Sequence, residues 1–445
     1  MNWNRLVSDL RWGREEKYAS SDLRHGIGRR NSFEQDYDRL IFSAPFRRLQ
    51  NKAQIFPLPG NVFVHNRLTH SLEVSCVGRS LANWVGESLL TRHPDLHFSP
   101  YELSSIVAAA CLAHDMGNPP FGHSGERAIS SYFSEGQGRR WQDQVVQEGG
   151  RWEDFTHFEG NANTFRLLTH SFIGRREGGF SLTYSTLASI VKYPYPSTRA
   201  TKKGKFGFLA PEEQHFHKVA EHLGLLENGE GGYVRHPLVY LVEAADDICY
   251  EVMDLEDAFK LKILSYNEVS SLMLSFFSDE VQRHMCDVAA TIDDVNEKIA
   301  YFRSKLINLL VSETAKVFLT HEEEILQGYF QGTLVGNMCE QCCHAFRNAE
   351  KVAYSKIYLS RDVVDVELAG HRIFAELIER MMEALEHPQS SYGKAFLRRI
   401  SSQYDTSVST TYGRILTTLD YISGMTDLFA LDLYRKITGM NLPFV

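Results

Sequence analysis

The sequence is poor in the features that mark secreted and membrane-spanning proteins. Its 445 residues include only seven cysteines, an odd number that is too sparse for a disulfide framework. No apolar run approaches the ~20 residues that span a bilayer. Residues 1–5 also lack the apolar core of a secretion signal. We therefore expect reduced thiols, a cytoplasmic location and no membrane association.

Proline and strand-like patterns are scarce as well. No proline occurs between residues 238 and 387, where apolar residues recur at intervals of three and four. The chain shows no internal repeat and no sustained alternation of apolar and polar residues. Hydrophobic residues make up 43% and charged residues 23%, which is ordinary globular usage. These observations predict an all-α protein with several long helices in its second half.

An excess of positive charge is also missing. The formal net charge of −9 opposes a protein devoted to coating nucleic acid. The polar residues 1–31, which include Arg24, Arg29 and Arg30, leave single-stranded nucleic acid open as a secondary ligand; they form an ordered arm or a partly mobile terminus. After this arm we expect a core at 32–260, with a loop insertion at about 134–158, and then a C-terminal helical region at 261–445 packed on the core.

The most specific stretch begins with the pair His114-Asp115. The pair follows the apolar run 106–112 and precedes the turn Gly-Asn-Pro-Pro-Phe-Gly-His at 117–123. Polar side chains at the end of a buried helix are costly unless something coordinates them. A cation bound by imidazole and carboxylate would compensate for that cost.

The helix before this pair has clear limits. Residues 99–102, Ser-Pro-Tyr-Glu, predict a capping box with proline in the first turn, whereas Gly117 and Pro119 stop the helix. His114 and Asp115 should therefore lie at a fixed helix end. The short, stiff turn should bring His123 and Glu126 back over them.

Other helix starts and two ambiguous clusters are visible. Ser32 and Gln35 predict a capping box, residues 46–57 predict a helix that proline ends, and further helices should begin at Asn66, Glu159 and His236. The cysteine-rich run 339–344 resembles a zinc motif, but no second ligand pair lies at a suitable spacing, so a helical context is favoured. The basic loop at 202–205 is an ordinary solvated loop unless it lies over an anionic substrate.

The helix from His236 carries a second pattern. Asp246, Tyr250 and Asp254 recur every fourth residue and so share one face. At 1.5 Å per residue they would span roughly 12 Å, about the reach of a bound nucleotide. An acidic solvated face is an equally good interpretation of the pattern alone.

Together, His70, His114-Asp115 and Asp246 in a helical chain resemble the HD phosphohydrolase superfamily, which holds a metal ion in a helical bundle. The resemblance narrows to the deoxyguanosine triphosphate triphosphohydrolase family and covers roughly residues 30–260. The stretches that carry it, in order, are 33–39, 46–50, 66–71, 114–123, 158–162, 192–196, 205–207 and 245–250.

The resemblance implies a metal site and a reaction. The metal ligands would be His70, His114, Asp115 and Asp246, with Asp247 as an alternative to Asp246 that is out of phase with Tyr250. This mixed set suits Mn²⁺, Fe²⁺ or another borderline ion, with Mg²⁺, Ni²⁺ and Zn²⁺ also among the expected ions. The family hydrolyses dGTP, and in some cases other dNTPs, to the nucleoside plus tripolyphosphate.

The resemblance also implies roles for residues around the metal ion. His123 would be the general acid, with Glu126 orienting it and His157 near the phosphates, although His123 also fits a simple helix-capping role. Arg67, Lys192 and Lys205 would pair with phosphates. Tyr250 would pack under the deoxyribose and Asp254 would accept a hydrogen bond from the 3′-hydroxyl. The remaining substrate-binding residues would be Gln54, near the sugar or base, Asn118 and Tyr193.

Partners and alternatives follow the same resemblance. A dNTP would be the substrate, and a homo-oligomer, with a hexamer favoured, would be the assembly. The alternatives are another HD-type enzyme, such as a nucleotidase or a guanosine tetraphosphate hydrolase, and a protein that only binds nucleotides or single-stranded nucleic acid.

Overall fold

The computed structural model describes residues 1–16, 30–56, 64–229 and 231–440 of the chain. Over these residues the chain forms helices and a few isolated β-bridges, without a β-sheet. The all-α prediction is confirmed. None of the helices in this part of the chain is both long and apolar enough to cross a membrane.

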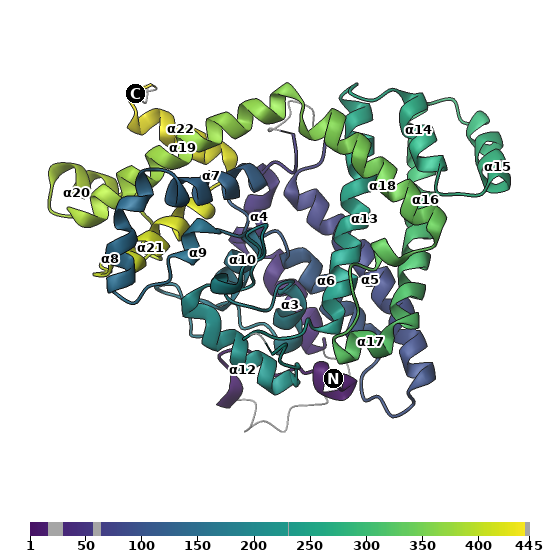
Figure 1. Ribbon diagram of the computed structural model, residues 1–445, viewed down its shortest axis with the longest axis horizontal. Coiled ribbons are helices and arrows are strands. Elements are labelled where there is room, and N and C mark those ends of the chain that lie inside the picture. Colours follow the sequence, from purple (N-terminus) through teal and green to yellow (C-terminus); the bar gives the residue numbers. More distant parts are fainter. Residues whose placement is uncertain (17–29, 57–63, 230, 441–445) are drawn as a thin grey trace.

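The α-helices in the first half of the chain lie around a central group of three (Figure 1). Their bounds are α1 (Trp3–Leu6), α3 (Ser32–Ile41), α4 (Ala44–Arg48), α5 (Arg67–Arg92), α6 (Pro100–Ala113), α7 (Gly122–Ser134), α10 (Gly160–Thr169), α11 (Tyr184–Ile190), α12 (Glu213–Leu223) and α13 (Pro237–Lys260). The central helices are α5, α6 and α13. Because α6 is apolar on nearly all sides, it is buried between its neighbours.

Close packing of α5 on α6 depends on a glycine. A Cβ atom added at Gly78 would lie 2.6 Å from Cys111 Sγ, so only glycine lets the two helices approach this closely. The predicted helix starts at Asn66, Ser99, Glu159 and His236 are confirmed as N-caps of α5, α6, α10 and α13. Ser99 and Glu102 form the expected capping box.

Two local predictions in the N-terminal half are wrong. The capping box of α3 uses Asn31 and Glu34, one residue earlier than predicted, because Asn31 is extended and Ser32 is already helical. The helix predicted over 46–57 ends at Arg48 and continues only as the 3₁₀ helix η1 (Leu49–Asn51). It ends early because Lys52 turns inward and its ammonium group donates hydrogen bonds to two backbone carbonyls from distant segments.

The segment 134–158, predicted to be loop-like, contains short helices. These are the 3₁₀ helix η2 (Gln137–Trp141), α8 (Gln142–Gln147) and α9 (Glu153–Thr156). Trp141 and Trp152 are buried in a hydrophobic cluster with Phe133 and Phe155. The segment is therefore packed against its neighbours rather than loop-like. The burial of its aromatic side chains fixes it, although its sequence has no helical periodicity.

The second half of the chain continues with helices, as predicted. Their bounds are α14 (Tyr266–Leu274), α15 (Asp279–Ala290), α16 (Val295–Thr320), α17 (Glu322–Gln327), α18 (Glu340–Ala353), α19 (Arg361–Glu386), α20 (Ser391–Leu397), α21 (Thr411–Ser423) and α22 (Asp427–Ile437). Between α18 and α19 lies the π-helical turn η6 (Tyr354–Tyr358). The shorter 3₁₀ helices are η3 (Ser197–Arg199), η4 (Ala210–Glu212) and η5 (Val335–Asn337).

Two hydrophobic cores join the halves. The larger core runs from Trp3 and Leu6 of α1 through α5, α6 and α13 to α16 and α18. The smaller core packs α7, η2 and α8 against α19, α21 and α22, and α19 runs along one edge of the molecule above α7 (Figure 1). The C-terminal helices therefore pack on the first half, whereas the boundaries predicted at residues 31 and 260 stay predictions.

Candidate metal centre and nucleotide cavity

The predicted metal ligands lie together where α5, α6 and α13 meet. One ligand atom each from His70, His114 and Asp115 lies within 4.8 Å of the other two. Asp246 Oδ1 from α13 lies 3.0 Å from His70 Nε2 and 3.5 Å from His114 Nε2. Two ligand atoms that bind one ion at right angles, each about 2.1 Å away, are separated by roughly 3 Å. The spacing of these donor atoms thus suits a single metal ion.

The strongest local sign of a metal ligand is an unpartnered nitrogen on His114. Its Nδ1 lies 2.6 Å from the carbonyl oxygen of Cys111, a contact in which Nδ1–H donates and which leaves Nε2 to face the carboxylates. That Nε2 atom is buried and has no hydrogen-bond partner among the described residues. Burial opposes charge on this ring, but the carboxylates of Asp115 and Asp246 outweigh it and raise the pKa of His114 to about 9. The cluster is therefore set to attract a cation.

Asp115 is held in place from two sides. Arg67 Nη1 donates to Asp115 Oδ2 at 2.6 Å, and the side-chain amide of Asn118 donates to Asp115 Oδ1 at 2.5 Å. Burial would raise the pKa of Asp115, but the positive charges of Arg67 and His114 lower it. Arg67, predicted to bind phosphate, thus orients a metal ligand, while its buried Nε has no hydrogen-bond partner among the described residues.

The structure separates Asp246 from Asp247. Asp246 contacts both histidines, whereas Asp247 contacts neither among the described residues; both aspartates line a neighbouring cavity of about 540 Å³. This arrangement agrees with the choice of Asp246, which the four-residue spacing to Tyr250 favoured.

A cavity of about 190 Å³ opens beside the metal cluster. Most of the predicted site residues line it, namely Gln54, Arg67, His114, Asp115, Asn118, His123, Glu126, Lys192, Tyr193, Lys205, Asp246 and Tyr250. His70 is nearly fully buried behind them. The structure thus gathers residues from segments nearly 200 positions apart around one space.

Two predicted residues lie away from this cavity. His157 lines an adjoining groove, which shares His123 and Lys205 with the cavity. Asp254 is buried one turn beyond Tyr250, and its Oδ2 accepts a hydrogen bond of 2.6 Å from the hydroxyl of Tyr358. The position of His157 near the phosphates stays a prediction, and the hydroxyl of Tyr358 occupies the oxygen of Asp254 that was expected to meet the 3′-hydroxyl.

His123 and Glu126 form a hydrogen-bonded pair at the edge of the cavity. His123 Nδ1 lies 2.7 Å from Glu126 Oε2, and the imidazole is partly exposed. Glu126 is buried and also accepts a hydrogen bond from Gly160 N. Burial would raise its pKa, but His123 and Lys205 lower the pKa of Glu126 to about 2.

The turn before His123 depends on a glycine. Phe121 and Gly122 both have positive φ, and a Cβ atom at Gly122 would lie 2.2 Å from Arg67 Nη2. This approach joins the segment that carries His123 to the guanidinium that holds Asp115. The segment that carries the His123–Glu126 pair thus lies directly against a residue of the predicted metal cluster.

The cationic residues of the cavity are paired with carboxylates. Lys192 Nζ lies 2.9 Å from Glu243 Oε1, and Lys205 Nζ lies 2.7 Å from Glu159 Oε1. Burial opposes charge on Lys192, but Glu243 outweighs it and raises the pKa of Lys192. An anionic ligand here would therefore compete with carboxylates for both lysines.

Sequence reasoning missed Glu159, Asn161 and Glu243, which also line the cavity. Glu159 and Asn161 lie inside one of the stretches that carried the resemblance, so that signal was available. Glu243 lies one helical turn before Asp246, but the pattern of acidic residues on this helix was equally typical of a solvated face. The zinc interpretation of residues 339–344 gains no support, since the described residues form a three-ligand cluster only at His70, His114 and Asp115.

Comparisons with known proteins agree with this geometry. The HD domain matches residues 67–175, and the phosphohydrolase-associated domain matches residues 337–436. Two proteins named deoxyguanosinetriphosphate triphosphohydrolase-like protein are each 37% identical to this chain: one from Pseudomonas aeruginosa, over 452 residues and all of both chains, and one from Synechocystis, over 455 residues, 99% of this chain and all of the other. The chain belongs to the deoxyguanosinetriphosphate triphosphohydrolase-like family.

A relative named deoxyguanosinetriphosphate triphosphohydrolase, from Yersinia enterocolitica, is 29% identical over 486 residues, covering 91% of this chain and 93% of its own. As a member of this family, the protein is a metal-dependent HD phosphohydrolase. The HD match contains His70, His114, Asp115, His123 and Glu126, whereas Asp246 lies beyond its C-terminal end. The phosphohydrolase-associated match covers α18 to α22, where motif reading found nothing to place.

Proposed function

We propose that the protein hydrolyses dGTP, and other dNTPs to a lesser extent, to the deoxynucleoside and tripolyphosphate. The observation that carries this proposal is that two groups of side chains with different chemistry line the same cavity. One is His114 Nε2, buried without a protein partner beside Asp115 and Asp246. The other is the His123–Glu126 pair on the same cavity wall.

The residues present fit a divalent metal ion, held by His70, His114, Asp115 and Asp246. Two imidazoles and two carboxylates suit Mn²⁺ or Fe²⁺ and admit Mg²⁺, Ni²⁺ or Zn²⁺. When bound, such an ion polarises the α-phosphate and acidifies water. Asn118 and Arg67 keep the Asp115 carboxylate oriented for this purpose.

His123 acts as the general acid in this proposal. A 5′-alkoxide is a poor leaving group, so the departing oxygen needs a proton as the bond to the α-phosphorus breaks. The buried carboxylate of Glu126 holds the imidazole through its Nδ1 and stabilises the protonated ring, which leaves Nε2–H free to donate. His157, in the adjoining groove, is the second candidate for this step.

The rest of the cavity binds the substrate. Lys192 and Lys205 exchange their carboxylate partners for phosphate oxygens, and the unpartnered Nε of Arg67 offers a further donor. Tyr250 forms the seat of the deoxyribose, with Tyr193 and Gln54 towards the base. Asp254 receives the 3′-hydroxyl only after its hydrogen bond with Tyr358 rearranges.

The test is a hydrolysis panel with products identified by ion chromatography. Metal-loaded protein is incubated with the four dNTPs, GTP, dGMP and guanosine tetraphosphate. The expected result is tripolyphosphate and deoxyguanosine from dGTP, with little GTP turnover. Orthophosphate from dGMP, or pyrophosphate from guanosine tetraphosphate, as the main product would overturn the proposal and favour another HD-type reaction.

Assembly and location belong to the same proposal. We expect a homo-oligomer, most simply a hexamer, in the cytoplasm. Single-stranded nucleic acid as a secondary ligand stays a prediction, because Arg24 and Arg29 lie outside the described residues.

A further inference from the structure

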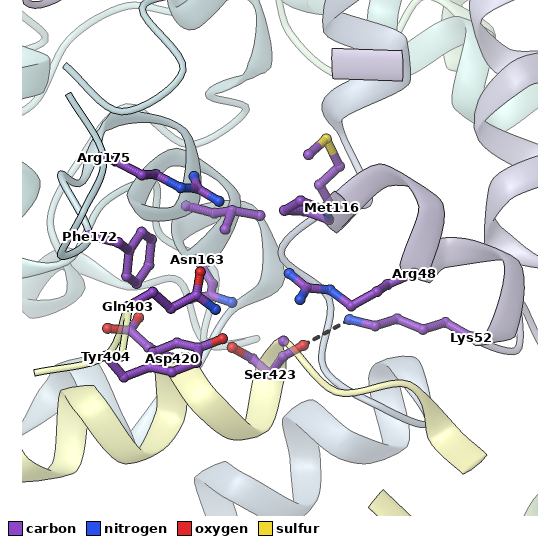
Figure 2. A pocket seen from close by; sticks show the side chains of 13 residues that line it. Arg48, Lys52, Met116, Asn163, Phe172, Arg175, Gln403, Tyr404, Asp420 and Ser423 are labelled. Carbon is purple, nitrogen blue, oxygen red and sulfur yellow. Dashed lines mark hydrogen bonds between the residues drawn. The ribbon is translucent and has the colours of Figure 1, made fainter. Parts of the chain in front are cut away.

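A second polar cavity lies on the other side of Asn118 and Met116 from the metal cluster. It is formed where the first half of the chain meets α21 and the loop before it. Figure 2 shows the side chains of Arg48, Arg175, Asn163, Gln403 and Asp420 turned towards a common space. The cavity is small, about 20 Å³, just above the ~10–15 Å³ that one water molecule needs.

Two arginines face this cavity without a carboxylate of their own. Among the described residues, neither Arg48 nor Arg175 forms a side-chain ion pair or hydrogen bond. Arg175 instead stacks over the rings of Phe172 and Phe180. Burial and the neighbouring charge of Arg48 both lower the pKa of Arg175.

The nearest carboxylate is already used. Asp420 lines the cavity, but both of its oxygens accept hydrogen bonds of 2.7 Å from Arg166. A third cationic side chain, Lys52, reaches the same wall and donates to the backbone carbonyls of Asn118 and Ser423. The charge of Lys52 is faced by the carboxylate of Asp427, whereas the two guanidinium groups have no such partner in the described part of the chain, which is unfavourable in a partly buried space unless an anion enters.

We propose that this cavity binds one phosphate group as a structural effector. Paired guanidinium groups match a tetrahedral oxyanion through bidentate hydrogen bonds, and Gln403 and Asn163 offer further amide donors. The space is far too small for a nucleoside, so the ligand is inorganic phosphate or a single exposed phosphate group. Phosphate is also larger than the space between the side chains, so the proposal requires the partly buried side chains of Arg48 and Arg175 to move outward when it binds.

The bound phosphate would connect the C-terminal region to the metal centre. Gln403, Asp420 and Ser423 belong to the phosphohydrolase-associated match, whereas Arg48 and Lys52 precede the HD match. Lys52 links the cavity to the metal centre, because it donates a hydrogen bond to the backbone carbonyl of Asn118, whose side chain donates one to Asp115. An anion at this place therefore clamps the two regions and stabilises the native protein.

The test compares inorganic phosphate binding by calorimetry to three metal-loaded proteins: the parent chain, Arg175→Gln and Arg176→Gln. Arg176 is the adjacent, exposed arginine, so its variant removes the same charge outside the cavity. Phosphate bound in the nucleotide cavity is common to all three. The parent and Arg176→Gln should show a further phosphate site, and in Arg175→Gln its affinity should fall at least tenfold. Equal phosphate binding by all three would overturn the proposal.

A charge of opposite sign gives a second test that does not depend on the fold of Arg175→Gln. Gln403→Glu places a carboxylate between the two arginines. It should raise the melting temperature in phosphate-free buffer and remove the further rise that phosphate gives the parent chain. Sodium acetate at equal ionic strength is the control with a planar anion, and it should raise the melting temperature of the parent less than phosphate does. A Gln403→Glu variant that is less stable than the parent, or that still gains from phosphate as the parent does, would contradict the proposal.

Discussion

The two walls of the nucleotide cavity differ in how their charges are satisfied. On one wall, His114 presents a nitrogen without a hydrogen-bond partner among the described residues, beside Asp246 and beside Asp115, whose carboxylate Arg67 and Asn118 hold in place. In another part of the lining, which we call the lysine wall, Lys192 and Lys205 are each paired with a carboxylate. The metal wall is thus complete before its ligand arrives, whereas the lysine wall must exchange partners when phosphate enters.

This difference separates two energetic tasks. A metal ion would bind ligand atoms that folding has already removed from water, so most of the desolvation cost is met during folding. When phosphate binds the lysines, the net free energy is only the difference between the lysine–phosphate and the lysine–carboxylate interactions. We therefore expect substitutions on the metal wall to abolish activity and those on the lysine wall to shift substrate affinity in either direction.

The largest effect should come from Asp246→Asn, compared with Asp247→Asn. Asp246 contacts both histidines, so its variant should lose bound metal and about 10³-fold or more in turnover, roughly 4 kcal/mol of barrier. Asp247→Asn should keep the metal, because its side chain faces the neighbouring cavity. Metal content by mass spectrometry and dGTP turnover check both. Metal retained by Asp246→Asn and lost by Asp247→Asn would reverse the ligand assignment.

The next effect concerns the general acid. His123→Ala should retain metal and still bind dGTP but lose about 10²–10⁴-fold in turnover. Glu126→Gln should lose less, since it removes only the charge that orients and stabilises the imidazole. A substrate with a 5′-sulfur leaving group, which needs no proton, should restore much of the His123→Ala rate. Full dGTP activity in His123→Ala, or no rescue, would move the role to His157.

A smaller effect should follow from freeing a lysine. Glu243→Gln removes the partner of Lys192 and of Arg235, so the cavity becomes more positive. The KM for dGTP should fall about two- to fivefold, equivalent to ~0.5–1 kcal/mol, and should rise more steeply with salt. Glu256→Gln is the matched control on the same helix, since Glu256 also pairs with two cations, Lys260 and Arg303, away from the cavity. An unchanged KM in Glu243→Gln would show that the pairing does not limit phosphate binding.

The last prediction concerns stability rather than turnover and tests how the metal wall is held in place. His65, just before α5, contacts Asp257 of α13 at 2.8 Å and Glu73 at 3.1 Å. Burial opposes the charge, but these carboxylates raise the pKa of His65 to about 10. The stabilisation should therefore be complete below pH 6.5 and decline as the pH rises towards 10.

The check compares His65→Gln with the parent chain by denaturant unfolding across this pH range. The difference in free energy of unfolding should be on the order of 2 kcal/mol at pH 6 and vanish near pH 10. His97→Gln, at an exposed position beyond α5, is the control. A difference that stays constant from pH 6 to pH 10 would contradict the charge-based account.

The helix ends, and with them the place of His114-Asp115 in the fold, were predictable because they follow local patterns. Ser99 with Glu102 limits α6 by local hydrogen bonding, and His114-Asp115 then falls at the end of a buried helix. The partners of the lysines were not predictable in this way. Glu159 caps α10 through its neighbours Asn161 and Ala162, but its contact with Lys205, 46 residues away, arises only from tertiary packing.

The same limit explains the two segments that differ from prediction. Residues 134–158 are fixed by the burial of Trp141 and Trp152. No periodic pattern in the sequence indicates that these two side chains are buried. The helix over 46–57 stops early because Lys52 is drawn to carbonyls of Asn118 and Ser423. In both cases a contact between distant segments outweighs local helix propensity.

Hydrolysis of dGTP in ¹⁸O-labelled water tests the central claim most directly. The account predicts that metal-loaded protein forms tripolyphosphate carrying one ¹⁸O atom and unlabelled deoxyguanosine, because water attacks the α-phosphorus while His123 protonates the departing 5′-oxygen. Label in the 5′-hydroxyl of deoxyguanosine would instead place bond cleavage at carbon, and label in orthophosphate or pyrophosphate would place attack at another phosphorus. Either result would contradict the proposed reaction.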